Sequence, residues 1–382
     1  MADGAVAGFA HDRFAAVRTA FEDNLASGAD VGASVCATLE GETVVDLWGG
    51  FADAAKSRPW QADTIVNVYS TTKTMTALCA LILADRGELD FDAPVARYWP
   101  QFAANGKAGV TVANLMGHTS GLSGWKEPVS NEDLYDWEKV ASLLAAQAPF
   151  WAPGTASGYH AITQGYLIGE VVRRITGRSL GAFFRQEIAE PLGADFHIGL
   201  PASEDDRVAE LIPTPPPPPS AETAAWSPSE LQLNIATNPG VHVPLHGTRA
   251  WRGAEIPAAG GTGNARSVAA IHVILANGGV AKGRRFLSEA GCRKALELQA
   301  EGDDLILGMP ARFGLGFALS GGPLPVPSPN SLFWGGYGGS LVIIDLDART
   351  SFAYVMNRLA GPMWDARALG LVTAMWQALG LV

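Results

Sequence analysis

The two ends of this chain carry the same pattern, a pair of apolar strand-like runs joined by a tight turn, together with an amphipathic helix. Near the start the turn falls at 40–42, and near the end it falls at 347–350. An apolar sheet face must be covered, so we expect both pairs to join one antiparallel sheet with helices packed on it. The expected strands are 33–39, 43–48, 340–346 and 351–356, and the flanking helices are 14–25 and 369–379.

The middle of the chain has helical spacing of apolar residues in several segments, some of them ended by glycine. We expect helices over 70–86, 164–175, 180–189, 266–276 and 288–298. The proline run at 213–219 favours a rigid surface loop, although such a run can also be a linker or a ligand for an SH3-like domain.

Composition excludes several classes of protein. With 48% hydrophobic residues the chain can bury a large core, so intrinsic disorder is excluded. A net charge of −11 argues against a nucleic-acid partner and against docking on anionic lipid. The segment 64–84 is too polar to cross a membrane, and the N-terminus lacks a secretory pattern, so a cytoplasmic location is expected. The three cysteines (Cys36, Cys79 and Cys292) are too scattered for a disulfide framework or a metal site.

The most informative motif is Ser-Thr-Thr-Lys at 70–73, at the start of a predicted helix. Residues i and i+3 share a helical face, so the amine of Lys73 can reach the hydroxyl of Ser70. Lys73 is the only charged residue between 64 and 84, and burial in apolar surroundings would lower its pKa enough to make it a base. The plainer alternative is that Ser70 only caps the helix and Lys73 extends to the surface.

Two further segments strengthen the catalytic interpretation. Tyr159 follows a turn rich in small residues and precedes a helix, and the glycine-dense segment 333–340 leads into a strand. Glycines at such a place let the backbone approach a ligand and present N–H groups to it. Taken one at a time, Tyr159 could be an ordinary core tyrosine and the glycines a simple hairpin turn. The occurrence of both features together with the Ser70–Lys73 motif, in this order, is much less expected by chance.

These motifs together resemble the serine β-lactamase and penicillin-binding-protein superfamily, in particular class C β-lactamases and family VIII carboxylesterases. The resemblance extends over about residues 30 to 345. The matching stretches are Asp-Leu-Trp-Gly-Gly at 46–50, Ser-Thr-Thr-Lys at 70–73, Leu-Met-Gly-His-Thr-Ser-Gly-Leu at 115–122, Pro-Gly at 153–154 and the glycine-rich segment at 334–340.

The resemblance implies roles for individual residues. Ser70 would be the nucleophile, Lys73 its partner base, and Tyr159 the tyrosine that shares proton transfer with the lysine. The backbone N–H groups of Ser70 and Tyr337 would form the oxyanion hole. Catalysis would then pass through an acyl-enzyme on Ser70. Which of Lys73 and Tyr159 is the dominant base stays open, because the two would titrate together.

Departures from the family pattern bear on the substrate. Class C enzymes have Tyr-x-Asn, but here the third residue is Ala161, and Trp334-Gly335-Gly336 stands where β-lactamases have Lys-Thr-Gly. The site therefore lacks a cationic anchor for a substrate carboxylate. We expect a serine carboxylesterase that hydrolyses small, short-chain esters and needs no cofactor or metal. The alternatives are a β-lactamase or penicillin-binding hydrolase, an acyltransferase on the same scaffold, and a non-enzymatic binding protein.

The expected fold is of the β-lactamase-like α/β (α+β) class, an antiparallel sheet flanked by helices with a smaller all-helical domain. The α/β domain would comprise 1–80 and 186–382, the helical domain 81–185, and the active site would lie in the cleft between them. We expect the substrate pocket to be lined by Trp125, Trp151, His160 and the segment Trp334-Gly335-Gly336.

Three other histidines are given structural roles. His118 lies in a His-Thr-Ser-Gly turn that the family shares. His242 and His246 are four residues apart, as in zinc-binding helices, but Pro244 between them argues against a helix and therefore against a metal site.

Overall fold

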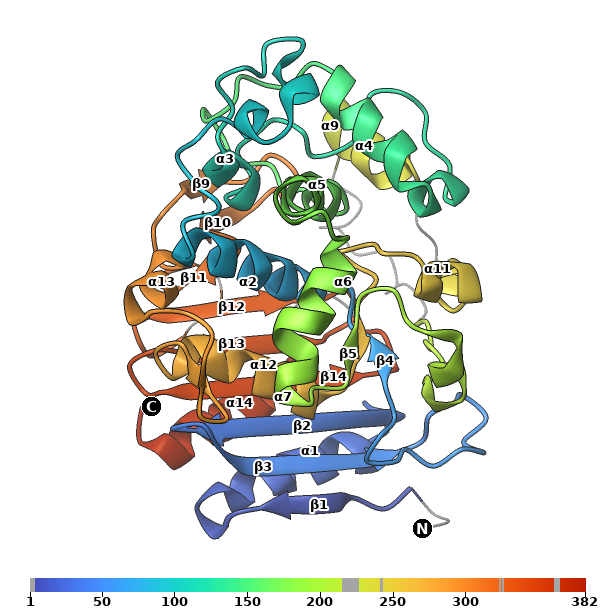
Figure 1. The fold of residues 1–382 in the computed structure, drawn as a ribbon. Helices are drawn as coiled ribbons and strands as arrows, with labels where there is room; N and C mark the ends of the chain where they lie inside the picture. Colours follow the sequence, from blue (N-terminus) through green and yellow to red (C-terminus); the bar gives the residue numbers. More distant parts are fainter. Residues whose placement is uncertain (1–3, 215–226, 241–242, 323, 325, 361–364) are drawn as a thin grey trace.

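The computed structural model describes residues 4–214, 227–240, 243–322, 324, 326–360 and 365–382, so most of the proline run at 213–219 lies outside the described residues. One nine-stranded antiparallel sheet organises the molecule (Figure 1). Its strands, in spatial order, are β1 (Ala7–Ala10), β3 (Glu42–Gly50), β2 (Gly32–Leu39), β14 (Thr350–Met356), β13 (Leu341–Asp345), β12 (Ser331–Gly335), β11 (Ala318–Leu319), β10 (Pro310–Phe313) and β9 (Ala300–Asp303).

The two chain ends meet in the middle of this sheet. β2 pairs along seven residues with β14, from Ala33 opposite Met356 to Leu39 opposite Thr350. The prediction that both ends build one antiparallel sheet is therefore confirmed.

Each face of the sheet is covered by helices, as the alternation of side chains along the strands requires. On one face Val35 and Tyr354 pack with α1 (Ala15–Ala26) and α14 (Ala366–Leu379). On the other face Cys36 and Val355 join a larger core with α12 (Ala265–Ala276) and α2 (Thr72–Asp85). The α+β architecture with a large antiparallel sheet is thus as predicted.

Helix α2 connects the sheet to the helical part of the molecule. Nearly all of its residues are buried, and it packs against α5 (Thr163–Thr176) and α6 (Leu180–Phe184). Because every face of α2 is covered, its sequence has no charged stripe, and Lys73 is its only charged residue before Asp85. The remaining helices are α3 (Val112–Met116), α4 (Trp137–Ala146), α5 (Thr163–Thr176), α6 (Leu180–Phe184), α7 (Glu190–Leu192), α9 (Glu230–Thr237), α10 (Val243–His246), α11 (Arg249–Gly253) and α13 (Glu289–Lys294).

Helix α9 lies on the helical side of the molecule in Figure 1, although it falls outside the predicted range 81–185. The amide oxygen of Asn238, at its C-terminal end, accepts a hydrogen bond from the backbone of Val129. The division into an α/β domain (1–80 and 186–382) and a helical domain (81–185) stays a prediction. Residues of α9 belong to the first range in sequence but pack on the helical side.

Several local predictions differ from the structure. The segment 69–71 forms a 3₁₀ turn before α2 starts, the predicted helix 180–189 continues from α6 as a π-helical turn over Arg185–Ala189, and α13 ends at Lys294 instead of continuing to 298. Short strands also occur that the sequence pattern is too brief to reveal, namely β4 (Val66–Asn67), β6 (Thr262–Gly263), β5 (Phe196–His197), β7 (Val280–Ala281) and β8 (Arg284–Arg285).

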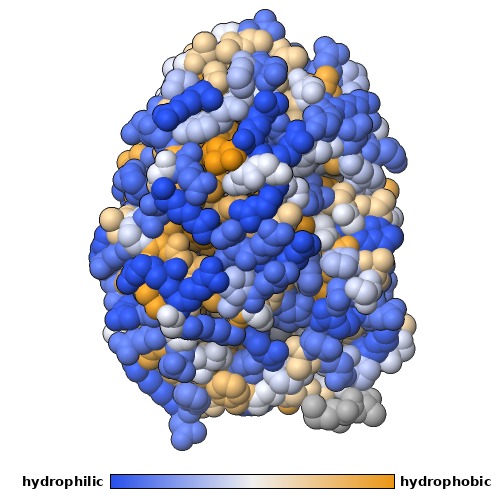
Figure 2. All heavy atoms as spheres, in the orientation of Figure 1, coloured by the Kyte–Doolittle hydropathy of each residue, from blue (hydrophilic) through white to orange (hydrophobic). Residues whose placement is uncertain are grey.

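The surface seen in Figure 2 is mainly hydrophilic, with hydrophobic side chains in separate patches. None of the helices in the described residues is long and apolar enough to span a lipid bilayer.

Candidate active site

The start of α2 brings Ser70 and Lys73 together. Ser70 lies in the 3₁₀ turn Tyr69–Thr71, one turn before Lys73 on the same face. The Nζ atom of Lys73 lies 3.1 Å from the Oγ atom of Ser70. The alternative that Lys73 extends to solvent is wrong, because its side chain is only 1% exposed.

The surroundings of Lys73 favour its neutral form. Burial lowers the pKa of Lys73 well below its usual value, and no carboxylate accepts a hydrogen bond from it among the described residues. Its Nζ donates to the backbone carbonyls of Ala161 at 2.7 Å and Ala258 at 2.9 Å. A neutral amine has two N–H bonds and one lone pair. In its neutral form, with both N–H bonds directed to these carbonyls, Lys73 presents its lone pair to the hydroxyl of Ser70.

Tyr159 approaches Ser70 from the helical side of the molecule. Its Oη donates a hydrogen bond of 2.7 Å to the Oγ of Ser70. Burial raises the pKa of Tyr159, while its hydrogen bond to Ser70 acts in the opposite direction. The phenol is therefore protonated at neutral pH and can serve as a donor to Ser70.

The loop that carries Tyr159 is fixed at its backbone by a buried carboxylate. The backbone N–H of Tyr159 donates to Oδ1 of Asp304 at 3.0 Å, and the same oxygen accepts from the N–H groups of Ile306 and Leu307, each at 2.9 Å. The ring of Tyr159 packs near the indole of Trp334, with ring centroids 5.8 Å apart. Sequence reasoning missed Asp304, because nothing local to it marks a contact with residue 159.

The glycine-rich turn after β12 lies against the start of α2. A Cβ atom on Gly336 would come within 2.2 Å of both Ser340 Oγ and the carbonyl oxygen of Val68, so only glycine fits there. The hydroxyl of Ser340 donates to that carbonyl at 2.8 Å and lies 2.9 Å from the hydroxyl of Thr71. These contacts hold the turn, and with it Tyr337, beside the segment that bears Ser70.

Ser70, Tyr159 and Tyr337 line one cavity of about 350 Å³. Tyr337 is 58% exposed, and its ring packs edge-on against that of Tyr69, with ring centroids 5.5 Å apart. No charged side chain occurs among the described residues that line this cavity. Its other lining residues are Tyr69, Ala161, Ile162, Ile235, Ala236, Pro239, Val243, His246, Trp251 and Ala259.

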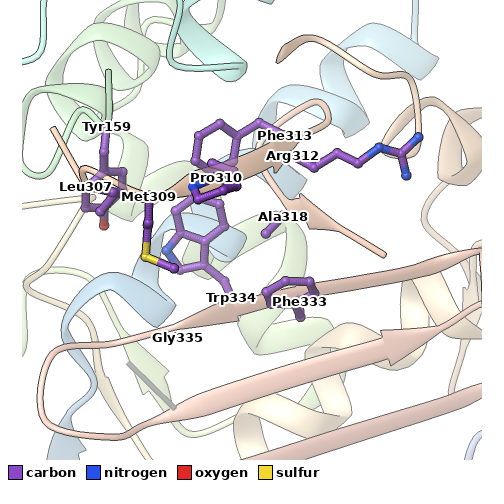
Figure 3. A pocket seen from close by; sticks show the side chains of 11 residues that line it. Tyr159, Leu307, Met309, Pro310, Arg312, Phe313, Ala318, Phe333, Trp334 and Gly335 are labelled. Atoms are coloured by element: carbon purple, nitrogen blue, oxygen red, sulfur yellow. The ribbon is translucent and has the colours of Figure 1, made fainter. Parts of the chain in front are cut away.

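A second, narrow cavity of about 30 Å³ adjoins the other side of Tyr159 (Figure 3). Trp334 and Gly335 line it together with apolar side chains of β10, including Phe313. Arg312 also borders it, but its guanidinium points away from the cavity, and it donates to the carbonyl of Ser320 at 2.6 Å. Both the wide and the narrow cavity thus have apolar walls that meet at Tyr159.

Four of the predicted pocket residues line neither cavity, namely Trp125, Trp151, His160 and Gly336. Trp125 is buried, and its indole N–H donates to the carbonyl of Val140 at 3.0 Å. Trp151 donates to the carbonyl of Ala156 at 3.0 Å. His160 is buried between Ser120 and the carbonyl of Gly158, and burial lowers its pKa to about 3. Closeness to the motifs in sequence was misleading here, because Trp125 and His160 are buried in the interior and the half-buried Trp151 packs against Gly158.

Residues of α9, α10 and α11, far away in the sequence, line the wide cavity instead, and no motif marked them as pocket residues. His246 lines the wide cavity, where its Nδ1 lies 2.8 Å from the hydroxyl of Tyr69. His242 lies outside the described residues. Among the residues that the structure describes, no group of three or more His, Cys, Asp or Glu side chains is arranged to hold a metal ion.

His118 is buried in the turn that the sequence motif indicated. Its Nδ1 accepts a hydrogen bond of 3.1 Å from the backbone N–H of His160, and its ring packs near that of Tyr159. Burial lowers the pKa of His118 well below its usual value, so it is a neutral packing residue behind the site.

Comparison with known proteins identifies the family. A family model described as Beta-lactamase matches residues 17–373. The esterase/beta-lactamase LipL of Mycobacterium tuberculosis is 38% identical over 373 residues, which are 94% of this chain and 84% of LipL. A crystal structure of a family VIII carboxylesterase is 43% identical, covers 98% of this chain and 100% of its own, and superposes with a TM-score of 0.93.

A penicillin-binding-protein homologue from Caulobacter crescentus is also similar, at 38% identity and a TM-score of 0.87 over 98% of this chain and 100% of that one. The resemblance inferred from the motifs is therefore confirmed. The family model extends over nearly the whole chain, and the relatives match it from end to end, so this chain belongs to the beta-lactamase family.

Proposed function

We propose that this beta-lactamase-family serine hydrolase is a carboxylesterase that forms its acyl-enzyme on Ser70. The observation that carries the proposal is the position of the Ser70 hydroxyl, 3.1 Å from the Lys73 amine and 2.7 Å from the Tyr159 hydroxyl, at the wall of an uncharged cavity. A serine becomes nucleophilic when a base can take its proton as it attacks.

The hydrogen-bond arrangement supports distinct roles for the two partners. Because both N–H bonds of neutral Lys73 are directed to carbonyls, its lone pair is free to take the Ser70 proton. Tyr159 keeps its proton and donates to Ser70 Oγ in the resting enzyme. When the tetrahedral intermediate collapses, the Lys73–Tyr159 pair returns a proton to the departing alkoxide. A water molecule then repeats the cycle on the acyl-enzyme.

The backbone N–H groups of Ser70 and Tyr337 are proposed to hold the developing oxyanion. Support comes from the glycine-rich turn, which is tied to the start of α2 through Ser340 and which puts Tyr337 in the same cavity as Ser70. Each such donor is worth ~10²–10³ in rate when it is preorganised.

The substrate is proposed to be a small uncharged ester. The wide cavity has no charged lining residue among those described, and Trp334 occupies the place of the lysine that would hold a carboxylate. The narrow cavity of about 30 Å³ favours a short chain on that side. The names of similar proteins include esterases, which agrees with this proposal.

A weaker β-lactam hydrolysis is the second candidate activity. It is favoured by the name of LipL, which combines esterase and beta-lactamase, and by the similar penicillin-binding-protein homologue. We also propose that the chain has no nucleic-acid or membrane partner, which the net charge of −11 supports. A cytoplasmic location is proposed as well, and the three free, buried cysteines support it.

Turnover of p-nitrophenyl butyrate and of nitrocefin, measured in parallel for the wild type and Ser70→Ala, tests the proposal. We expect fast ester cleavage, slow nitrocefin cleavage and loss of both in the variant. Ester cleavage that persists in a folded Ser70→Ala variant would disprove the proposed nucleophile. Nitrocefin turnover that exceeds ester turnover would show that β-lactam hydrolysis is the main activity.

A further inference from the structure

The residue directly before the nucleophile has an unusual backbone conformation. Tyr69 has φ = +46°, in the left-handed region that non-glycine residues rarely occupy. An aromatic side chain gains nothing locally from that conformation, so contacts elsewhere must hold it in place. Such backbone strain commonly accompanies a functional position.

His246 provides the main polar contact of the Tyr69 side chain. Its Nδ1 lies 2.8 Å from the Tyr69 hydroxyl, and the histidine is only 5% exposed. The imidazole is itself held against the indole of Trp251, with ring centroids 4.0 Å apart. Tyr69 is thereby anchored to α10 and α11, which come from a part of the chain 177 residues away.

The conformation of Tyr69 determines the direction of one catalytic group. The peptide plane between residues 69 and 70 contains both the Tyr69 carbonyl and the Ser70 N–H. The carbonyl accepts a hydrogen bond of 2.5 Å from the hydroxyl of Thr72, which orients this plane from one end. The hydrogen bond between the Tyr69 hydroxyl and His246 fixes the side chain of the same residue.

We propose that His246 is a positioning residue, which acts through Tyr69 to aim the Ser70 N–H at the substrate oxyanion. This inference rests on the proposed function, because it needs an acyl-enzyme on Ser70 and an oxyanion to stabilise. The Oγ of Ser70 is hydrogen-bonded to Lys73 and Tyr159, so proton transfer is left to those two residues and not to Tyr69 and His246. Loss of the hydrogen bond between His246 and Tyr69 lets the Tyr69 backbone relax and turns the Ser70 N–H away. This weakens binding of the transition state more than binding of the substrate.

The test compares Tyr69→Phe, His246→Leu and the double variant with p-nitrophenyl butyrate. We expect each single variant to lower kcat about tenfold, a fraction of the ~10²–10³ that loss of a whole oxyanion donor costs, with KM changed less than about twofold. The double variant should be no slower than the slower single variant, because both substitutions break the same interaction. His246→Asn, whose amide lies near the position of Nδ1, should recover most of the rate.

Two matched controls separate positioning from general damage. Tyr166→Phe removes another buried tyrosine hydroxyl, which donates to the carbonyl of Leu134, and His272→Leu removes a buried histidine in α12. Both controls should keep the wild-type kcat, whatever their effect on the melting temperature.

Three results would overturn the inference. One is a kcat within twofold of wild type in both single variants, another is a loss confined to KM, and the third is independent losses that multiply in the double variant. An active Ser70→Ala variant would instead refute the proposed function itself, so the two failures are distinguishable.

Discussion

At the scale of single residues, the chemistry depends on where one amine is placed. The sequence predicted the burial of Lys73, because no other charge occurs between 64 and 84. It could not predict that the carbonyls of Ala161 and Ala258 would accept its two N–H bonds, since both come from distant segments. For the same reason His246, which a spacing argument considered only as a metal ligand, was not connected with Tyr69.

The pH dependence of kcat/KM tests the state of Lys73. Burial lowers its pKa, and only the neutral amine can accept the Ser70 proton. Activity should therefore be lost as the pH falls through the lowered Lys73 pKa and should reach a plateau above that pKa. A rate that instead decreases steadily from about pH 5 to about pH 8 would contradict a neutral Lys73 base.

Lys73→Arg and Lys73→Met complement this profile. Arginine stays charged at all accessible pH values and methionine has no basic group, so both should lose at least ~10²-fold in kcat/KM. Circular dichroism and thermal melting check that the variants fold. If either folded variant retains the wild-type rate, Lys73 is not the base.

At the scale of elements, long periodic segments were predictable and short strained ones were not. The strand pairs at both ends and the helix that carries Lys73 follow clear apolar spacing, and they lie where expected within a few residues. The edge strand β1 and the 3₁₀ turn at Tyr69 have no such pattern, because tertiary contacts stabilise them. The pocket walls formed by α9, α10 and α11 were missed for the same reason.

Gly336 provides a test of the contact between β12 and α2. A methyl group there would collide with the backbone of Val68, so Gly336→Ala must push the turn away from Ser70. We expect kcat for p-nitrophenyl butyrate to fall at least ~10-fold, because the Tyr337 N–H moves with the turn.

Gly370→Ala is the matched control, since a Cβ atom at that position in α14 meets nothing within 4 Å. This variant should keep full activity and gain up to about 1 kcal/mol of stability. Equal rates for Gly336→Ala and wild type would show that the turn does not position the site.

At the scale of the whole molecule, a buried ionic cluster joins the two chain ends behind the sheet. Arg367 of α14 lies 2.8 Å from Oδ1 of Asp30, and the hydroxyl of Tyr354 donates to the same carboxylate. Burial raises the pKa of Asp30, while Arg367 and Tyr354 act against that shift. Arg367 also donates to the carbonyl of Gly338 at 2.9 Å, so the cluster supports the glycine-rich turn of the site.

Arg367→Met should destabilise the fold strongly, by about 3–5 kcal/mol, because it strands the Asp30 carboxylate in the core. In the variant, the folded-state pKa of Asp30 rises further above its unfolded value. The variant is therefore most stable at low pH, where Asp30 is protonated, and loses stability as the pH rises and Asp30 becomes charged. Denaturant unfolding should show a deficit that narrows as the pH is lowered, and adding Asp30→Asn should recover part of it. A deficit that widens toward acid pH would contradict this interpretation of the cluster.

Labelling with a serine-reactive phosphonate tests the central claim most directly, because it identifies the nucleophile without assuming the natural ester. We predict that esterase activity falls in proportion to the phosphonate bound, that mass spectrometry finds the label on Ser70, and that Ser70→Ala takes up none. Inactivation with the label on another residue, or full activity in protein labelled at Ser70, would contradict an acyl-enzyme on Ser70.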